Sequence, residues 1–174
     1  MVTKWCENAL KIHNKGEFTH GFTMKPWRYL TRKGGTDVAS FTNNYKHTID
    51  AKNRLFIPAR FRAMLGESFY LYYEPGSPCI AVFSEEEWEK KSNEVVESRD
   101  ADWQRYFFSN VITVEPDKQG RVTVKPDFCK GAGLKKDVAV VGVGNRVEIW
   151  DADKYDAEHA QLEATSKRFP SMVN

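Results

Sequence analysis

The sequence predicts an α+β fold in which two related β-β-α-β-β-α units close on one another as a pseudo-twofold barrel, with the helices outside. The first observation behind this is that a five-residue pattern, Asp-x-x-x-Arg, occurs twice, at Asp50–Arg54 and at Asp117–Arg121. The second is that a shift of 67 residues aligns the two copies without a gap. The third is size, because one such unit is too small to bury an adequate core alone.

Each motif is expected to form the turn between two short strands. Asp50 and Asp117 suit the first position because their carboxylates accept backbone N–H bonds. The fourth position holds Asn53 in one copy and Gly120 in the other, the two residue types that best tolerate positive φ. Runs of β-forming residues flank these turns at 45–49, 55–57, 111–114 and 122–124.

A short helix, a second hairpin and a longer helix follow in each copy. Pro58 and Pro126 open the short helices, as proline does in the first helical turn. The second hairpins are expected at 69–83 and 137–150. Ser84 begins a capping box for one helix reaching about residue 106, and Asp151 caps another reaching about residue 167.

Composition favours a globular cytosolic protein. The 174 residues are 41% hydrophobic and 29% charged, and no apolar run is long enough to cross a bilayer or resembles a signal peptide. We therefore expect no membrane partner. The cysteines Cys6, Cys79 and Cys129 lack metal-ligand spacing, which predicts reduced thiols, no metal site and no cofactor.

Charge is unevenly distributed along the chain. Of the 26 basic residues, seven lie in residues 1–37 with three of the 24 acids, which leaves 19 bases against 21 acids afterwards. A generally basic footprint for nucleic acid is therefore absent from the duplicated body. Any DNA contact there has to be local.

The segments 45–62, 117–124 and 147–151 together resemble the MraZ family. That resemblance implies a bacterial transcriptional regulator built as a doubled AbrB-like swapped-hairpin barrel. It further implies a homo-oligomeric ring bound to double-stranded DNA at promoter direct repeats, associated with the nucleoid, and expected to repress its own division and cell-wall gene cluster. The motif arginines would face the DNA.

The candidate site residues take three roles. Arg54 and Arg121 are expected to pair with guanine edges in the major groove, while Asp50 and Asp117 orient them. Phosphate contacts are expected from Lys46, Lys52 and Lys118. In the simpler alternative each arginine only pairs with the aspartate of its own turn, and the two roles are compatible.

Two other functions are weighed against DNA binding. An enzyme is disfavoured because no phosphate-binding glycine loop or His-Glu metal motif occurs, and His47 is interpreted as an ordinary side chain with its hydrogen bonds satisfied. The stronger alternative is an oligomeric protein-interaction module whose acidic helices bind a partner and whose DNA contact is weak and nonspecific.

Three segments are expected: an extension at 1–37, a first repeat at 38–108 and a second repeat with a C-terminal tail at 109–174. The extension has no counterpart in the family pattern. We interpret it as a product of start-site choice or as poorly ordered chain, since Lys33-Gly34-Gly35 can be encoded by a ribosome-binding sequence. The alternative is a basic arm that binds phosphate.

Overall fold

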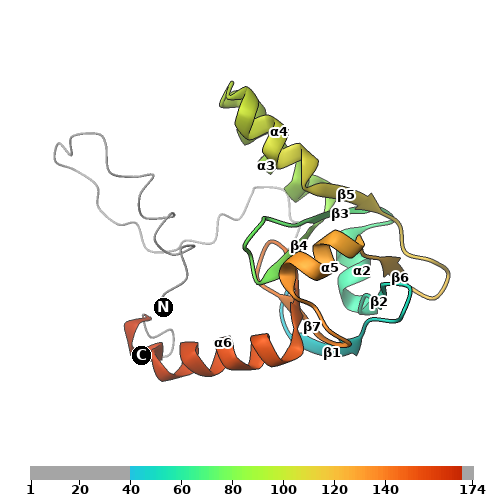
Figure 1. The fold of residues 1–174 in the computed structure, drawn as a ribbon, viewed down its shortest axis with the longest axis vertical. Coiled ribbons are helices and arrows are strands. Elements are labelled where there is room, and N and C mark those ends of the chain that lie inside the picture. The colour runs from blue at the N-terminus through green and yellow to red at the C-terminus, as the bar shows by residue number, and fades with distance from the viewer. Residues whose placement is uncertain (1–39, 170–174) are drawn as a thin grey trace, which may run out of the picture. The chain divides into compact units, whose positions relative to one another are not determined.

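The computed structural model describes residues 40–169 (Figure 1). Val38–Asn174 forms one compact unit, and the expectations for residues 1–37, like that for Cys6, lie outside the described residues. Among residues 40–169, none of the helices has the length and apolar character needed to cross a bilayer.

The two copies contain helices and antiparallel strands in corresponding order, as an α+β fold requires. The first copy comprises β1 (Asn44–Thr48), β2 (Arg54–Phe56), α2 (Ala59–Leu65), β3 (Phe69–Tyr72), β4 (Cys79–Phe83), α3 (Glu85–Glu97) and α4 (Ala101–Ser109). The second comprises β5 (Val111–Val114), β6 (Arg121–Thr123), α5 (Pro126–Ala132), β7 (Asp137–Gly142), β8 (Val147–Asp151), α6 (Ala152–Ala164) and a 3₁₀ turn, η1 (Ser166–Arg168).

The copies exchange strands. Strand β1 of the first copy pairs with β7 of the second, and β5 of the second pairs with β3 of the first. The resulting six-stranded sheet has the order β1-β7-β8-β4-β3-β5, and β2 pairs with β6 in a separate two-stranded sheet. The strands of the two copies correspond as β1 with β5, β2 with β6, β3 with β7 and β4 with β8. Exchanging each strand for its counterpart gives the same six-stranded order read from the other edge, and the same β2·β6 pair. The strand pairing therefore has pseudo-twofold symmetry.

The pseudo-twofold axis passes through two residue pairs. Leu55 lies opposite Val122 in the two-stranded sheet, and Ala81 lies opposite Glu148 where β4 meets β8. Both pairs join residues that are 67 apart, so each residue faces its own counterpart. The two Asp-x-x-x-Arg turns are therefore related by this axis.

The expected gapless alignment is wrong for one strand pair. Tyr70 lies opposite Phe83 in the first copy, and Ala139 lies opposite Trp150 in the second. Phe83 and Trp150 correspond at a shift of 67, but Tyr70 and Ala139 correspond at 69. The second copy has gained two residues before β7 and lost two in the turn before β8, which are surface connections that tolerate such changes.

The expected closed barrel is not found either. Among residues 40–169, β1 and β5 remain the edges of the six-stranded sheet, and β1 meets β2 only through the bridge Ile49–Leu55. Inside that bridge the turn is closed by its own bonds: the backbone N–H of Asp50 donates to the carbonyl of Arg54 at 3.0 Å, and the backbone N–H of Arg54 donates to the carboxylate of Asp50.

The main core lies between the six-stranded sheet, the β2·β6 ribbon and the short helices α2 and α5, which are seen together in Figure 1. Phe61 of α2 and Phe128 of α5, one from each copy, are buried in it. Its strand residues include Leu71 and Ile149, again one from each copy. The two copies therefore share this main core.

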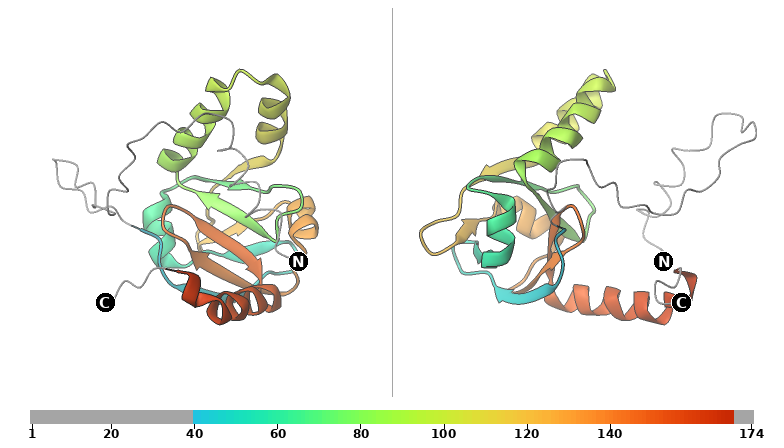
Figure 2. Two further views of the ribbon diagram at one scale, coloured as in Figure 1. Left: turned by 90° about the vertical axis from the view of Figure 1, so that its left-hand side faces the viewer. Right: turned by 180° about the vertical axis from the view of Figure 1, so that it is seen from behind.

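A second cluster attaches α3 and α4 to the β3–β4 end of the sheet. Trp88 of α3 stacks on Tyr70 of β3 and on Phe107 of α4, with ring centroids 5.0 Å apart in both cases. Phe83 and Val95 complete the buried part. Figure 2 shows α3 and α4 as a pair that projects from this end.

The single helix expected from Ser84 to about residue 106 is interrupted. Helix α3 ends at Glu97, Arg99 has φ +55°, and a new helix begins at Ala101. Asp100 caps that helix by accepting bonds from the N–H groups of Asp102 and Trp103. The aspartate competes for the backbone and restarts the helix.

The starts of α3 and α6 agree with their capping signals, whereas α6 ends at Ala164, before the expected residue 167, and the 3₁₀ turn η1 follows it. Ser84 accepts a bond from the N–H of Glu87, and Asp151 accepts one from Lys154. Asp151 is 1% exposed and also accepts from the N–H of Lys135, which fixes the start of α6 against the sheet. From there α6 extends away from the strands (Figure 2).

Candidate nucleic-acid interface

The two motif turns have the same internal geometry. In the first, Asp50 accepts bonds from the N–H groups of Lys52 and Arg54 at 2.8 and 2.9 Å. In the second, Asp117 accepts from Gln119 and Arg121 at 2.9 and 3.0 Å. The carboxylates therefore close the turns, as expected from the sequence.

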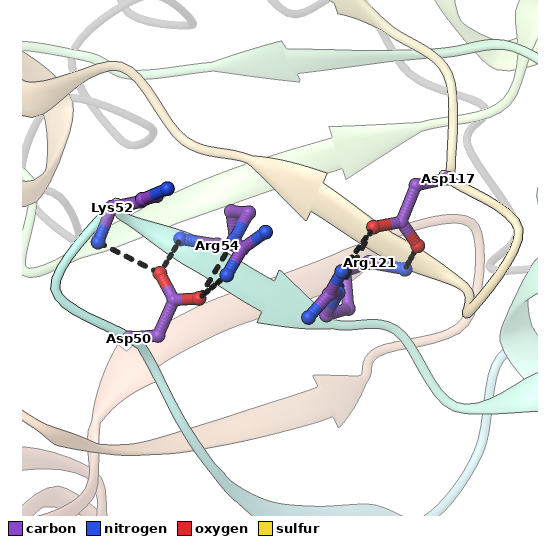
Figure 3. A network of polar contacts seen from close by, with 5 residues as sticks. All are labelled: Asp50, Lys52, Arg54, Asp117 and Arg121. Atoms are coloured by element: carbon purple, nitrogen blue, oxygen red, sulfur yellow. Dashed lines mark hydrogen bonds and ion pairs between the residues drawn. The ribbon is translucent and has the colours of Figure 1, made fainter.

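Each aspartate also holds its arginine. Nε and Nη2 of Arg54 lie 2.7 and 2.6 Å from Oδ2 of Asp50. The corresponding distances from Arg121 to Oδ2 of Asp117 are 2.9 and 2.8 Å. A guanidinium carries five N–H donors, and Nη1 takes no part in this contact. Figure 3 shows the two Asp–Arg pairs side by side.

Both ion pairs lower the pKa of the aspartate carboxyl group. The side-chain hydrogen bond from Arg54, followed by its backbone N–H, lowers the pKa of Asp50 from 3.8 to about 2. The backbone N–H of Arg121, followed by its side chain, lowers the pKa of Asp117. The aspartates are therefore ionised and hold the arginines throughout the neutral range.

The arginines occupy one face of the β2·β6 ribbon. Leu55 and Val122 point into the core and are 0% and 1% exposed. Because side chains alternate along a strand, Arg54 and Arg121 lie on the opposite, outer face. Arg54 pairs with Thr123, so Arg121 is its diagonal neighbour, about 7–8 Å away by strand geometry. The two motifs thus form one surface rather than two separate hairpin tips.

The lysines of the expected site are divided between two places. Lys52 and Lys118 are exposed in the two turns, next to the ribbon. Lys46 lies elsewhere: its Nζ is 2.7 Å from Asp156 of α6, and this bond raises the pKa of the lysine. Since strand residues alternate, Lys46 is on the α6 side of β1.

The fourth turn position differs between the copies in a way that the sequence did not indicate. Asn53 and Gly120 both have positive φ, 56° and 79°. At Gly120, however, a Cβ atom would lie 2.7 Å from Cζ and Nε of Arg62, a side chain of α2. A Cβ atom there would push the flexible end of Arg62 aside, so glycine permits both the positive φ and the close approach of that guanidinium. No local spacing rule reveals this contact, because it joins the two copies.

His47 departs from its expectation. Its ring lies against Phe56, with centroids 5.3 Å apart, and its Nε2 is buried without a hydrogen-bond partner among residues 40–169. Burial lowers the pKa of the ring. A histidine with satisfied hydrogen bonds was expected here, so that expectation is wrong.

The two cysteines within residues 40–169 are unpaired. Cys79 and Cys129 are free thiols, and burial raises the pKa of Cys79 to about 12. Within the described part of the chain, no three His, Cys, Asp or Glu side chains are grouped to hold a metal ion. The donors around the ribbon are the guanidinium groups of Arg54 and Arg121, each ion-paired with an aspartate, and the ammonium groups of Lys52 and Lys118.

The fold and the site define a duplicated α+β protein whose paired Asp-x-x-x-Arg turns place two half-buried arginines on the outer face of one two-stranded ribbon. The family model for MraZ protein matches the chain twice, at residues 40–110 and at residues 107–171. The chain belongs to the MraZ family.

Individual relatives agree with this assignment. A protein of Mycoplasma mobile is 41% identical over 117 residues, covering 65% of this chain and 80% of the relative. One of Micrococcus luteus is 41% identical over 129 residues, covering 71% and 90%. One of Desulforamulus reducens is 37% identical over 139 residues, covering 76% and 96%. Each is named transcriptional regulator MraZ and none is named an enzyme, which confirms the resemblance and the indication against catalysis.

Proposed function

We propose that this chain is a DNA-binding transcriptional regulator that reads sequence with the outer face of the β2·β6 ribbon. The observation that carries the proposal is the placement of Arg54 and Arg121 as diagonal neighbours on that face, each held by an aspartate. Family membership supports the regulatory role, since the relatives are named transcriptional regulators.

The major groove of B-DNA accepts a two-stranded β-ribbon. In this mechanism Asp50 and Asp117 fix Nε and Nη2 of their arginines, and the remaining donors of each guanidinium face guanine O6 and N7. Holding the side chains in advance reduces the conformational entropy lost on binding. Each bidentate contact contributes about 1–3 kcal/mol of discrimination between bases.

Lys52 and Lys118 would contact phosphates beside the ribbon. Such contacts position the protein without reading bases, and they weaken as salt rises. Lys46 would have to leave Asp156 before reaching a phosphate, so we assign it the smallest contribution of the expected lysines.

We further propose that the chain acts as a ring of identical subunits on direct repeats in the promoter of its own division and cell-wall gene cluster, where it represses transcription and associates with the nucleoid. These steps rest on the family. Exposed apolar side chains on α4 and α6 support subunit contacts: Trp103, Tyr106, Phe108 and Leu162 are 37–43% exposed. A ring would present several ribbons at once, and avidity would offset weak binding by one subunit.

The test is fluorescence anisotropy of the full chain on DNA from immediately upstream of its gene, at two salt concentrations. The variant Arg54→Ala/Arg121→Ala should bind more than about 25-fold more weakly, because two base contacts are lost, while its oligomeric state is unchanged. The matched control, Lys90→Ala/Arg105→Ala, removes the same charge from exposed sites on α3 and α4; with its oligomeric state measured alongside and unchanged, it should bind like the wild type. Equal binding by both double variants would contradict the proposal.

One observation favours a second function. The aromatic side chains on α4 give the α3–α4 pair a partly apolar surface, and the first turn of α3 is acidic at Glu85, Glu86 and Glu87. Such a surface suits a protein partner. If the full chain binds no DNA while Trp103→Ala/Phe108→Ala alters its assembly, the interaction module becomes the better description.

A further inference from the structure

Arg62 breaks the pseudo-twofold symmetry of the DNA-facing ribbon. Its counterpart 67 residues later is Cys129, which is 8% exposed and belongs to the core. The guanidinium of Arg62 lies beside Gly120 at one end of the ribbon, whereas the corresponding residue of the other copy is a buried thiol. The backbone pairing is symmetric, but its chemistry is not.

The guanidinium of Arg62 is held in place by three contacts. Its Nε donates to the carbonyl of Ile57 at 3.0 Å. Its Cζ lies 5.6 Å from the ring centroid of Phe56, over the ring. It also lies against Gly120, where a Cβ atom would be 2.7 Å from Cζ. A planar guanidinium stacks on an aromatic ring and donates in its own plane, which lysine cannot do.

These contacts place Arg62 beside the reading face. Phe56 lies directly opposite Arg121 in the ribbon, and both side chains are on its outer side. Arg62 is only partly buried, and it lines an open pocket together with Asp117 of the second turn. The bond to Ile57 uses Nε, so the two Nη groups are not part of it.

The other end of the ribbon offers no equivalent. The counterpart of Phe56 is Thr123, which has no ring on which a guanidinium could stack. Cys129 is neutral, and burial raises its pKa. The Asn53 turn therefore presents Arg54 and Lys52, whereas the Gly120 turn presents Arg121, Lys118 and, in addition, Arg62.

We propose that Arg62 is a third DNA-contacting arginine and that it gives the ribbon a direction, so that one subunit recognises an asymmetric sequence. The inference rests on the proposed DNA-binding function. A symmetric ribbon would favour an inverted sequence centred on the axis between Leu55 and Val122. With Arg62 at one end only, base preference extends further on the side next to Gly120, and neighbouring sites on DNA must share one orientation.

The experiment measures base preference along the binding site. The full chain is titrated, by anisotropy, against the shortest upstream duplex that it binds and against every single base-pair substitution of that duplex. Arg62→Met should reduce affinity roughly 5- to 150-fold and abolish base preference on one side of the site only. Arg62→Lys should keep the salt dependence but lose the same one-sided preference.

Arg60→Met is the matched control. Arg60 is exposed on the same helix, but residues two apart do not share a helix face, so this variant should bind as the wild type does. Gly120→Asn gives an independent test, because the added Cβ displaces Arg62. Introduced alone, it should cause the same one-sided loss of base preference as Arg62→Met. Added to Arg62→Met, it should have little further effect.

The outcomes separate this inference from the proposed function. An Arg62→Met variant that folds and keeps wild-type affinity and preference overturns the inference, and so does a loss spread equally over both sides. If Arg54→Ala/Arg121→Ala still weakens binding in either case, the proposed function stands. If the wild type shows no sequence preference, both fail.

Discussion

At the residue scale, the aspartates of the two turns act on backbone and side chain together. Asp50 accepts two backbone N–H bonds and holds Arg54 through its second oxygen. Turn chemistry alone would explain the aspartate, and DNA binding alone would explain the arginine. The geometry shows that one carboxylate serves the turn and also restrains the guanidinium.

The lowered pKa of Asp50 leads to a prediction about pH. Its folded value, about 2, lies below the ordinary 3.8, so the unfolded chain binds the proton first as pH falls. The ionised group therefore stabilises the turn fully above about pH 4, and this stabilisation is lost as pH falls towards 2. An NMR titration of the Asp50 carboxyl carbon should have its midpoint near 2.

The variant Arg54→Ala provides the comparison for that titration. Because the side-chain bond from Arg54 is the largest cause of the shift, its removal should raise the midpoint towards the ordinary value. A wild-type midpoint near 3.8 would mean that the ion pair does not form in solution.

Sequence reasoning reached these turn residues because their roles are local. Positions one, four and five of each motif carry the turn, and all three can be assigned from spacing. Arg62 and His47 could not be assigned in this way. Arg62 contacts Gly120 of the other copy, and His47 is placed against Phe56 of another strand, so both depend on which strands pair.

At the element scale, two tryptophans on neighbouring helices should respond differently to substitution. Trp88 is 8% exposed and stacks between Tyr70 and Phe107, whereas Trp103 is 43% exposed. Trp88→Ala should cost roughly 3–5 kcal/mol of folding free energy, because it leaves a cavity in the second cluster. Trp103→Ala in the isolated subunit should change it by less than about 0.5 kcal/mol.

Urea unfolding measures these free energies, and hydrogen exchange shows where they act. In Trp88→Ala, protection should fall first in α3 and α4, while the β2·β6 ribbon keeps its protection. Equal losses for the two tryptophan variants would show that the second cluster does not hold these helices on the sheet.

The break between α3 and α4 offers a separate test. Asp100 caps α4 through two backbone N–H bonds, so Asp100→Ala should destabilise the protein by about 1 kcal/mol. The measured quantity is the urea midpoint. Asp127→Ala is the control, because Asp127 is an exposed acid in the first turn of α5 whose contact is a 3.8 Å ion pair with Lys125; a midpoint shift no larger in Asp100→Ala would contradict the capping role.

The type of each element, helix or strand, was largely predictable from the sequence, whereas the strands that pair with one another were not. Strand runs, prolines and caps are local signals, and the observed elements follow them closely. The interruption at Asp100 was missed because the apolar pattern continues across it to Trp103. The two-residue change before β7 was missed because a rigid shift cannot show compensating loop lengths.

At the scale of the whole molecule, strand exchange makes the two copies interdependent. Strand β1 of the first copy pairs with β7 of the second, and β5 of the second pairs with β3 of the first. In either half alone, β1 or β5 would therefore have no strand to pair with. Residues 38–108 and 109–174, prepared separately, should each fail to give a folded NMR spectrum. Mixed in equal amounts, they should recover the spectrum of residues 38–174.

The spectrum of the mixture is the informative measurement. A half that folds alone with native shifts would show that the exchange of β1 and β5 is dispensable. Recovery on mixing depends on both the β4·β8 and β2·β6 pairings, where the axis lies, so Leu55→Asp should prevent it.

The covalent link between the two copies also concerns how such a protein can change. In an assembly of two identical chains, one codon change alters both sides at once, and every gain at one end is imposed on the other. Here each end is encoded separately, so an arginine could arise at position 62 while position 129 kept a small buried side chain. Fusion into one gene thus frees each half to diverge while the shared backbone constrains both.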